Sequence, residues 1–127
     1  MAFASGCIAI PLTGAVAHLG GEVANVANPE GVPLIITDVK LYAVTPSANV
    51  CVLHVGIGTT AQHDANELVN DMDIVATTAG TAWHAMTALV ANGAAVIWGA
   101  AQFLTSCGSA SSVGFAGTLF VEYIRAT

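Results

Sequence analysis

Runs of residues that alternate between apolar and polar constrain the fold of this chain more than any other feature of its sequence. In residues 34–44, one set of alternate positions is apolar: Ile35, Val39, Leu41 and Ala43. The opposite set carries Asp38, Lys40 and Tyr42. Residues 50–58 repeat the pattern, with Cys51, Leu53, Val55 and Ile57 on one face and Val52, His54 and Gly56 on the other. A period of two is typical of β-strands with one buried face.

Further strands and frequent turns complete this pattern. Residues 96–106 and 115–124 are rich in apolar and β-branched residues and predict two long strands, while residues 15–27 predict a weak one. Gly, Pro, Asn and Ser clusters mark turns at residues 20–21, 28–31, 45–47, 92–93 and 108–112. With no sustained helix, the sequence predicts an all-β fold: an antiparallel, jelly-roll-like β-sandwich of five to eight strands, forming one domain over residues 13–127.

The middle of the chain predicts one or two short helical turns. Residues 64–67 place Asp64 at an N-cap and Glu67 at the third helical position, so we expect a helical turn there. A short strand is expected at residues 72–76. Residues 83–90 are alanine-rich and are compatible with a second helical turn.

Residues 1–12 read as an apolar N-terminal arm. The arm contains Phe3, Ile8 and Ile10, and Pro11 disfavours a central position in a sheet. We expect either a strand exchanged with a second copy or a strap onto a partner. Deleting the arm should then weaken association while leaving the sandwich folded. Full unfolding of the truncated chain would instead identify a core strand.

Charge is scarce and unevenly placed. Only ten of 127 residues are charged, the net charge is −6, and Lys40 and Arg125 are the only basic residues. The chain is too apolar to be intrinsically disordered, and it cannot neutralise a run of phosphates, so nucleic-acid binding is excluded. Half of the acids lie in residues 64–73, whereas residues 74–121 carry no charge at all.

The charge deficit predicts association with other chains. A folded monomer of this mass exposes roughly 6,200 Å², of which ten charged side chains cover only about a sixth. The final strand is apolar on both faces, so its outer face needs a loop or a neighbouring subunit as cover. The residues expected at an interface are Phe3, Ile8, Ile10, Leu119, Phe120, Val121, Tyr123 and Ile124.

Membrane insertion and disulfide bonding are both disfavoured. Residues 88–107 are hydropathic but contain Asn92, Gly93, Gly99 and Gln102, and no basic residue flanks them. The N-terminus lacks the positive region of a signal peptide. Cys7, Cys51 and Cys107 are therefore expected as free thiols, with Cys51 acting as a small hydrophobic residue.

No motif predicts catalysis, a metal or a cofactor. His18, His54, His63 and His84 show no metal-ligand spacing, and no nucleophile turn or phosphate loop is present. His63 and Asp64 could bind a cation together with Glu67 and Asp71, but a solvated acidic loop is the expected interpretation. The chain is thus expected not to be an enzyme.

Carbohydrate binding is the alternative function, because β-sandwiches bind sugars on exposed aromatic residues. The candidates are Trp83, Trp98, Tyr42 and Tyr123. Trp98 lies in an apolar segment, which favours packing in a core or an interface. A host-surface or carbohydrate-binding domain therefore stays open.

The order of these features resembles that of small bacteriophage virion proteins of the decoration, or cement, type. The resemblance rests on the turn at residues 28–31, the strand at 34–42, the segments 55–58 and 67–73, and the strand at 117–124. It covers most of residues 25–127 and is a pattern of strands and turns. Phage fibre proteins are similar in this pattern, so the alternative is a host-surface or carbohydrate-binding domain of a phage fibre or spike.

The resemblance implies a sandwich on the outer surface of an icosahedral capsid, assembled in the host cytoplasm. Such a protein would be a dimer or trimer that bridges subunits of the major capsid protein, without catalytic residues. The low charge agrees, since a cement protein works by burying uncharged surface across subunit boundaries. The acidic net charge suits the outside of a shell.

Overall fold

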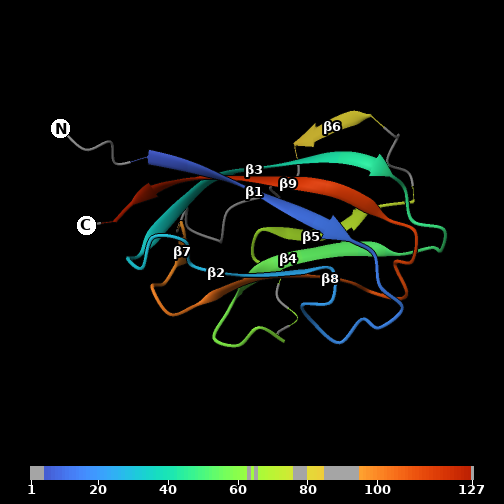
Figure 1. Ribbon diagram of the computed structural model, residues 1–127, viewed down its shortest axis with the longest axis horizontal. Helices are drawn as coiled ribbons and strands as arrows, with labels where there is room; N and C mark the ends of the chain where they lie inside the picture. Colours follow the sequence, from blue (N-terminus) through green and yellow to red (C-terminus); the bar gives the residue numbers. More distant parts are fainter. Residues whose placement is uncertain (1–4, 63, 65, 76–79, 85–94, 127) are drawn as a thin grey trace.

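The chain folds into two antiparallel β-sheets packed face to face (Figure 1). The computed structural model describes residues 5–62, 64, 66–75, 80–84 and 95–126, with the backbone alone for residues 81–84. The strands are β1 (Ser5–Thr13), β2 (Ala24–Ala27), β3 (Leu34–Thr45), β4 (Val52–Gly58), β5 (Val69–Asp73), β6 (Thr81–His84), β7 (Val96–Trp98), β8 (Phe103–Gly108) and β9 (Ala116–Arg125). The predicted all-β sandwich is confirmed.

The strand pairing is that of a jelly roll. Sheet A has the order β1-β9-β3-β6, with the short strand β7 also paired to β3, and sheet B has the order β2-β8-β4-β5. With β7 set aside, the first strand pairs with the last, the second with the last but one, and so on inward to the β4–β5 pair. Eight strands wrapped in this manner form the double-sheet jelly roll.

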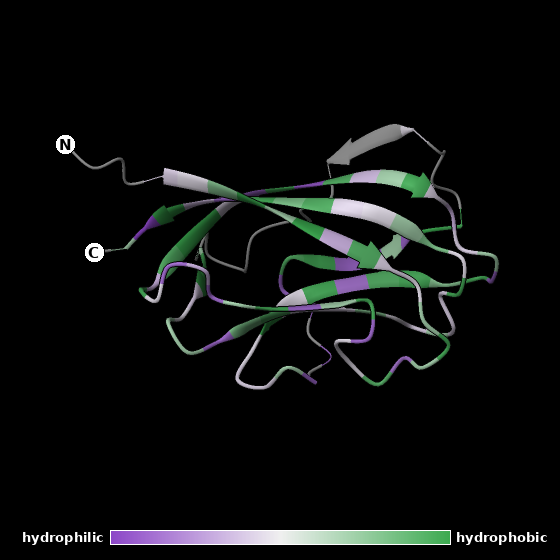
Figure 2. Ribbon diagram, viewed as in Figure 1, coloured by the Kyte–Doolittle hydropathy of each residue, from purple (hydrophilic) through white to green (hydrophobic). Residues whose placement is uncertain are grey.

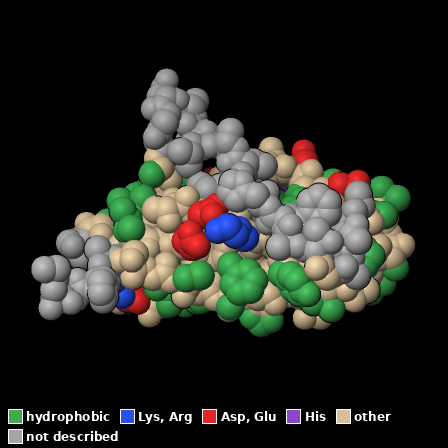
Figure 3. All heavy atoms as spheres, turned by 90° about the horizontal axis from the view of Figure 1, so that it is seen from above, with side chains coloured by type: hydrophobic (Ala, Val, Ile, Leu, Met, Phe, Trp, Pro, Cys, Tyr) green, Lys and Arg blue, Asp and Glu red, His purple; other side chains and the backbone are tan. Residues whose placement is uncertain are grey.

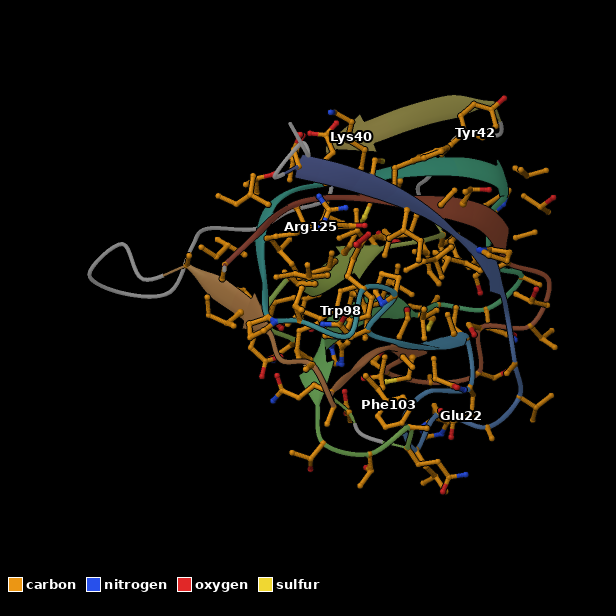
Figure 4. All side chains as sticks on the ribbon, turned by 60° about the vertical axis from the view of Figure 1, so that its left-hand side comes forward. Glu22, Lys40, Tyr42, Trp98, Phe103 and Arg125 are labelled. Atoms are coloured by element: carbon orange, nitrogen blue, oxygen red, sulfur yellow. The ribbon has the colours of Figure 1, made fainter. Side chains whose placement is uncertain are left out.

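One hydrophobic core lies between the sheets. Alternate residues of the long strands point inward, and Figure 2 shows hydrophobic and hydrophilic residues alternating along both sheets. Trp98 lies between the sheets, fully buried, and its indole Nε1–H donates to the Gln102 carbonyl at 3.0 Å (Figure 4). The expectation that Trp98 packs in a core or an interface is met by the core.

The predicted faces of β3 are corrected near its start. The sequence places Ile35 on the same face as Val39, but the structure buries Leu34 and Ile36 and leaves Ile35 only partly buried. A bulge between Ile36 and Asp38, opposite β9, is the reason. An extra residue in one strand shifts the alternation, so that the faces before and after it exchange.

The predicted strand at residues 96–106 is two strands in different sheets. β7 pairs with β3 in sheet A, and β8 pairs with β2 and β4 in sheet B. The chain crosses between the sheets at Gly99–Gln102, where the Gln102 amide donates to the Gly99 carbonyl and the Gln102 side chain accepts from the Gly99 amide. This closed turn breaks the apolar run.

The predicted helical turns are wrong where the structure describes the chain. Asp64, Asn66 and Glu67 are in irregular backbone, and no described residue is helical. Strand β5 covers Val69–Asp73 in place of residues 72–76. The second predicted turn begins in β6, and its residues 85–90 lie outside the described part of the chain. Where the structure describes the chain, no helix has the length and apolar character that a membrane span requires.

The N-terminal segment forms an edge strand of sheet A. β1 pairs with β9 of the same chain from Ser5 to Thr13, and Ile10 and Leu12 are buried in the core. Pro11 therefore lies in an edge strand, where a missing N–H is tolerated. Whether this strand also exchanges with a second copy stays a prediction. The weak strand expected at residues 15–27 is restricted to β2.

Candidate interaction surface

The outer face of sheet A exposes a broad, mostly uncharged surface. We call it the sheet A face and define it by the outward residues of its three long strands: Cys7, Ala9 and Pro11 of β1, Thr118, Phe120, Glu122 and Ile124 of β9, and Asp38, Lys40, Tyr42 and Val44 of β3. The strands are in register, with Phe120 opposite both Ala9 and Lys40. The result is a continuous surface three strands wide.

Large hydrophobic side chains are exposed on this face. Val44 is 51% exposed, Tyr42 41%, Ile124 38% and Phe120 37%. Figure 3 shows hydrophobic side chains beside a compact charged cluster near the middle of this view, with a few further charged atoms at its edges. The partial exposure of large residues in one patch distinguishes this face from the scattered exposed residues that any soluble protein has.

The charged cluster on the sheet A face is nearly self-neutralised. The Lys40 ammonium lies 2.8 Å from the Asp38 carboxylate and 3.4 Å from the Glu122 carboxylate. The hydrogen bond that Lys40 donates to Asp38 and the charges of both carboxylates raise the pKa of Lys40. Lys40 and Tyr42 both lie on the outer side of β3 (Figure 4). The three charged side chains on the sheet A face thus sum to a net charge of −1.

The structure separates the predicted interface residues into two groups. Ile10, Leu119, Val121 and Tyr123 are buried within the chain, and Ile8 packs against the core. Phe120 and Ile124 are exposed on the sheet A face. Phe3 lies outside the described residues. The sequence could not predict Tyr42 and Val44 as part of this patch, because strand order places them beside β9.

A shallow hollow lies at one end of the sheet A face. Its lining comes from β1, β9 and β3: Ser5, Gly6, Cys7, Thr37, Glu122, Tyr123 and Ile124. The Tyr123 ring lies where a Cβ on Gly6 would be, which explains the glycine in β1. The Tyr123 hydroxyl donates to Glu30 at 3.2 Å, and Arg125 donates to both carboxylate oxygens of Glu30 at 3.0 Å.

The outer face of sheet B differs, because loops cover it. Thr105 and Cys107 point outward from β8 yet are fully buried. The loop around Gly21 meets the loop around Ala61, since a Cβ on Gly21 would be 2.1 Å from the Ala61 carbonyl oxygen. This side of the molecule therefore has no open strand surface comparable to the sheet A face.

A mixed cluster of His54, Asp64, Asp71 and Cys107 lies beneath one of these loops. His54 Nδ1 is 3.1 Å from Asp64 Oδ1, and His54 Nε2 is 2.9 Å from Asp71 Oδ1. The Cys107 thiol donates to the same Asp64 oxygen at 3.3 Å. The sequence missed this cluster because His54 and Cys107 become neighbours only through the pairing of β4 with β8.

The local environment raises the pKa of two groups in the cluster, His54 and Cys107. Burial lowers the pKa of His54, but the hydrogen bonds to Asp71 and Asp64 outweigh it, so the pKa is raised. Burial, then the hydrogen bond to Asp64, raises the pKa of Cys107 to about 12. A thiol with such a pKa is not a nucleophile near neutral pH. The cluster is therefore poorly suited to covalent catalysis.

The other predicted chemical groups are dispersed. His18 is exposed in the loop before β2, and Glu67 accepts a hydrogen bond from the Ile57 amide. His63 is outside the described residues. All three cysteines are free, with Cys7 exposed and Cys51 and Cys107 buried, as the sequence predicts.

The aromatic side chains considered for sugar binding that the structure describes do not share an exposed surface. Trp98 and Tyr123 are buried, whereas Tyr42 is exposed on β3. The backbone of Trp83 and His84 lies in β6, next to Leu41 and Lys40. Of the four candidates, the described side chains provide a single exposed ring.

Comparisons with known proteins add a structural similarity. No protein-family model and no curated protein matches the sequence. Among solved structures, the chain resembles a component of a phage capsid, a chain of the cyanophage Pam1 capsid asymmetric unit. The two chains are 14% identical, the alignment covers 98% of this chain and 89% of the other, and the TM-score is 0.44.

Proposed function

We propose that this chain is a structural virion protein that decorates a bacteriophage capsid and bridges major capsid protein subunits, with the sheet A face turned toward the shell. It would lie on the outer surface of the capsid and associate with further copies of itself as a dimer or trimer. Its role would be stabilisation by protein–protein contacts, without catalysis or a cofactor.

The distribution of charge carries this proposal. Lys40 is paired with Asp38 and Glu122, and Arg125 is paired with Glu30, so both basic residues lie at sheet A and neutralise the acids there. The remaining acids are Glu22, Asp64, Glu67, Asp71 and Asp73, in the loops and strands of sheet B. One side of the molecule is therefore almost neutral and apolar, and the opposite side is strongly acidic.

The size of the sheet A face supports a stable contact. The molecule exposes 6242 Å² in total, and an interface of ordinary size covers about 800 Å² per partner, about an eighth of that surface. Three strands of nine to twelve residues, spaced about 4.8 Å apart and rising about 3.3 Å per residue, offer an area of this order once side chains are included. A modest affinity per site is sufficient when it is repeated over a shell.

The decisive experiment measures binding to capsids that lack the protein. The variant Phe120→Glu places a charge in the centre of the sheet A face, and it should reduce co-sedimentation with such capsids at least tenfold. Val50→Glu is the matched control, because Val50 is 90% exposed in the turn between β3 and β4, away from this face. Circular dichroism and thermal unfolding establish that both variants are folded.

Two outcomes would contradict the proposal. One is wild-type protein that does not sediment with the capsids. The other is a folded Phe120→Glu variant that binds as well as Val50→Glu, which would remove the sheet A face as the contact. Light scattering of the free protein tests self-association separately, and a mass of 12.7 kDa would exclude the dimer or trimer.

A further inference from the structure

We propose that His54, Asp64 and Cys107 form a binding site for a divalent cation of the zinc class. The site lies on the outer side of sheet B, so it is independent of the proposed capsid contact. The sequence predicts no metal, because the three residues have no recognisable spacing along the chain.

The fold brings three different ligand types to one point. His54 on β4 and Cys107 on β8 are directly opposite each other in neighbouring antiparallel strands, and both point outward. The loop before β5 places the Asp64 carboxylate over this pair. The three ligand atoms, an imidazole nitrogen, a thiol sulfur and a carboxylate oxygen, all lie within 4.8 Å of one another.

The two separations that involve the Asp64 oxygen are close to those of a tetrahedral metal site. Zinc bonds of about 2.0–2.1 Å to nitrogen and oxygen and about 2.3 Å to sulfur imply ligand separations of about 3.4 Å for N to O and about 3.6 Å for O to S. The observed distances are 3.1 Å from His54 Nδ1 to Asp64 Oδ1 and 3.3 Å from Cys107 Sγ to the same oxygen. A cation that replaces the shared protons needs only a few tenths of an ångström of expansion.

Asp71 supplies an independent indication. Its carboxylate accepts a hydrogen bond from His54 Nε2 at 2.9 Å, on the side of the ring opposite to Asp64. When Nε2 carries this proton, the Nδ1 lone pair is left on the side of the ring that meets Asp64. A carboxylate behind a histidine in this manner fixes the tautomer of metal-binding histidines and strengthens them as ligands.

The chemistry and the exposure favour a zinc-class ion and give it access. A thiolate and an imidazole are soft or borderline ligands, which favours Zn²⁺ or Co²⁺ over Mg²⁺ or Ca²⁺. Cys107 is 1% exposed at the base of the site, whereas the Asp64 side chain is 51% exposed at its mouth. Three protein ligands leave the fourth position to water.

The test is a Co²⁺ titration of the full-length, reduced, metal-free protein. A thiolate ligand produces a charge-transfer absorption band in the near ultraviolet, and we expect this band to saturate at one ion per chain. Zn²⁺ should displace Co²⁺ and should raise the unfolding temperature by roughly 5 °C at saturation. Absence of both effects would overturn the proposal.

Variants separate the site from other thiols. Cys107→Ser should abolish the band, whereas Cys51→Ser, which alters the other buried cysteine, should leave it unchanged. Asp71→Asn should weaken Co²⁺ binding about 10- to 100-fold while keeping the band. If Cys107→Ser does not fold, Asp64→Asn on the exposed loop provides the same test. A band that persists in Cys107→Ser, or full affinity in Asp64→Asn, would contradict the site.

Discussion

Asn28 holds together the turn that links β2 to β3. Its side-chain amide donates to the Val32 carbonyl and the Trp98 carbonyl, both at 2.9 Å. Its side-chain oxygen accepts from the Glu30 and Gly31 amides, also at 2.9 Å. A single side chain thus closes the turn and joins it to the end of β7.

Replacing Asn28 by alanine should lower the free energy of unfolding by about 2–3 kcal/mol, because several partly buried polar groups lose their partner at once. Urea denaturation measures the change. Asn49→Ala is the matched control: Asn49 also lies in a turn, but its amide makes one exposed bond of 3.4 Å to Ser111, so a change below about 0.5 kcal/mol is expected. Equal effects of the two variants would contradict this account.

Ionisation of Tyr123 should lower the free energy of unfolding at alkaline pH. Burial, and then the hydrogen bond to Glu30, raise the pKa of Tyr123, while Arg125 opposes this and Cys7 adds to it. Because the folded-state pKa lies above the usual value of about 10, the contribution is present below pH 10 and is lost as the pH rises through the folded value. Tyr123→Phe should therefore make the unfolding free energy fall less steeply above pH 10. An unchanged slope in denaturant titrations across this range would count against the interaction.

At the scale of elements, β1 behaves as a strand of the sandwich's own sheet. Leu12 is 2% exposed in the core, so Leu12→Ala should cost about 2–4 kcal/mol of unfolding free energy. Ala9→Ser, on the exposed side of the same strand, should change it by less than about 0.5 kcal/mol. Thermal unfolding of both variants checks this. A Leu12→Ala variant as stable as Ala9→Ser would show that β1 contributes little to the fold.

Truncation of residues 1–12 tests the same strand as a whole. The truncation removes both Ile10 and Leu12 from the core. The truncated chain should therefore no longer show the cooperative unfolding transition at the wild-type temperature. A truncated chain that keeps the wild-type unfolding temperature but fails to associate would instead support an arm used by a partner.

The elements differ in how far local sequence determines them. Residues 51–55, at and just before the start of β4, follow their alternation, so Cys51, Leu53 and Val55 are predicted and found inside. In β3, one bulge reverses the face of Ile35, and no residue at that point of the sequence indicates a bulge. The crossing at Gly99 depends on bonds to Asn28 and Gln102, which are tertiary contacts that composition does not show.

The residues of the candidate sites also differ in how far the sequence predicts them. The sequence predicts Phe120 and Ile124 as interface residues because β9 is apolar on both of its faces. The sequence alone does not show which face points into the core. The strand order decides this, and it buries Leu119 and Val121. His54 and Cys107 are far apart in sequence, so only the pairing of β4 with β8 could reveal their cluster.

At the scale of the whole molecule, the charge asymmetry predicts how binding depends on salt. The sheet A face carries a compensated charge cluster, so capsid binding through it should be mainly apolar. We expect the affinity to change less than about threefold between low salt and about 0.5 M salt, where exposed charges are strongly screened. Sedimentation at several salt concentrations measures this. A steep loss of binding with salt would indicate that the acidic side makes the contact instead.

The position of β9 also has a consequence for synthesis. β9 lies between β1 and β3 in sheet A, yet among the described strands it comes last along the chain and β1 comes first. Until β9 has been synthesised, β1 lacks the strand it pairs with and the hydrophobic side chains of β3 lack their neighbour. Contacts so distant in sequence form slowly, and unpaired strands favour aggregation. The sandwich therefore cannot form before β9 has left the ribosome, and until then the nascent chain is most dependent on protection from other chains.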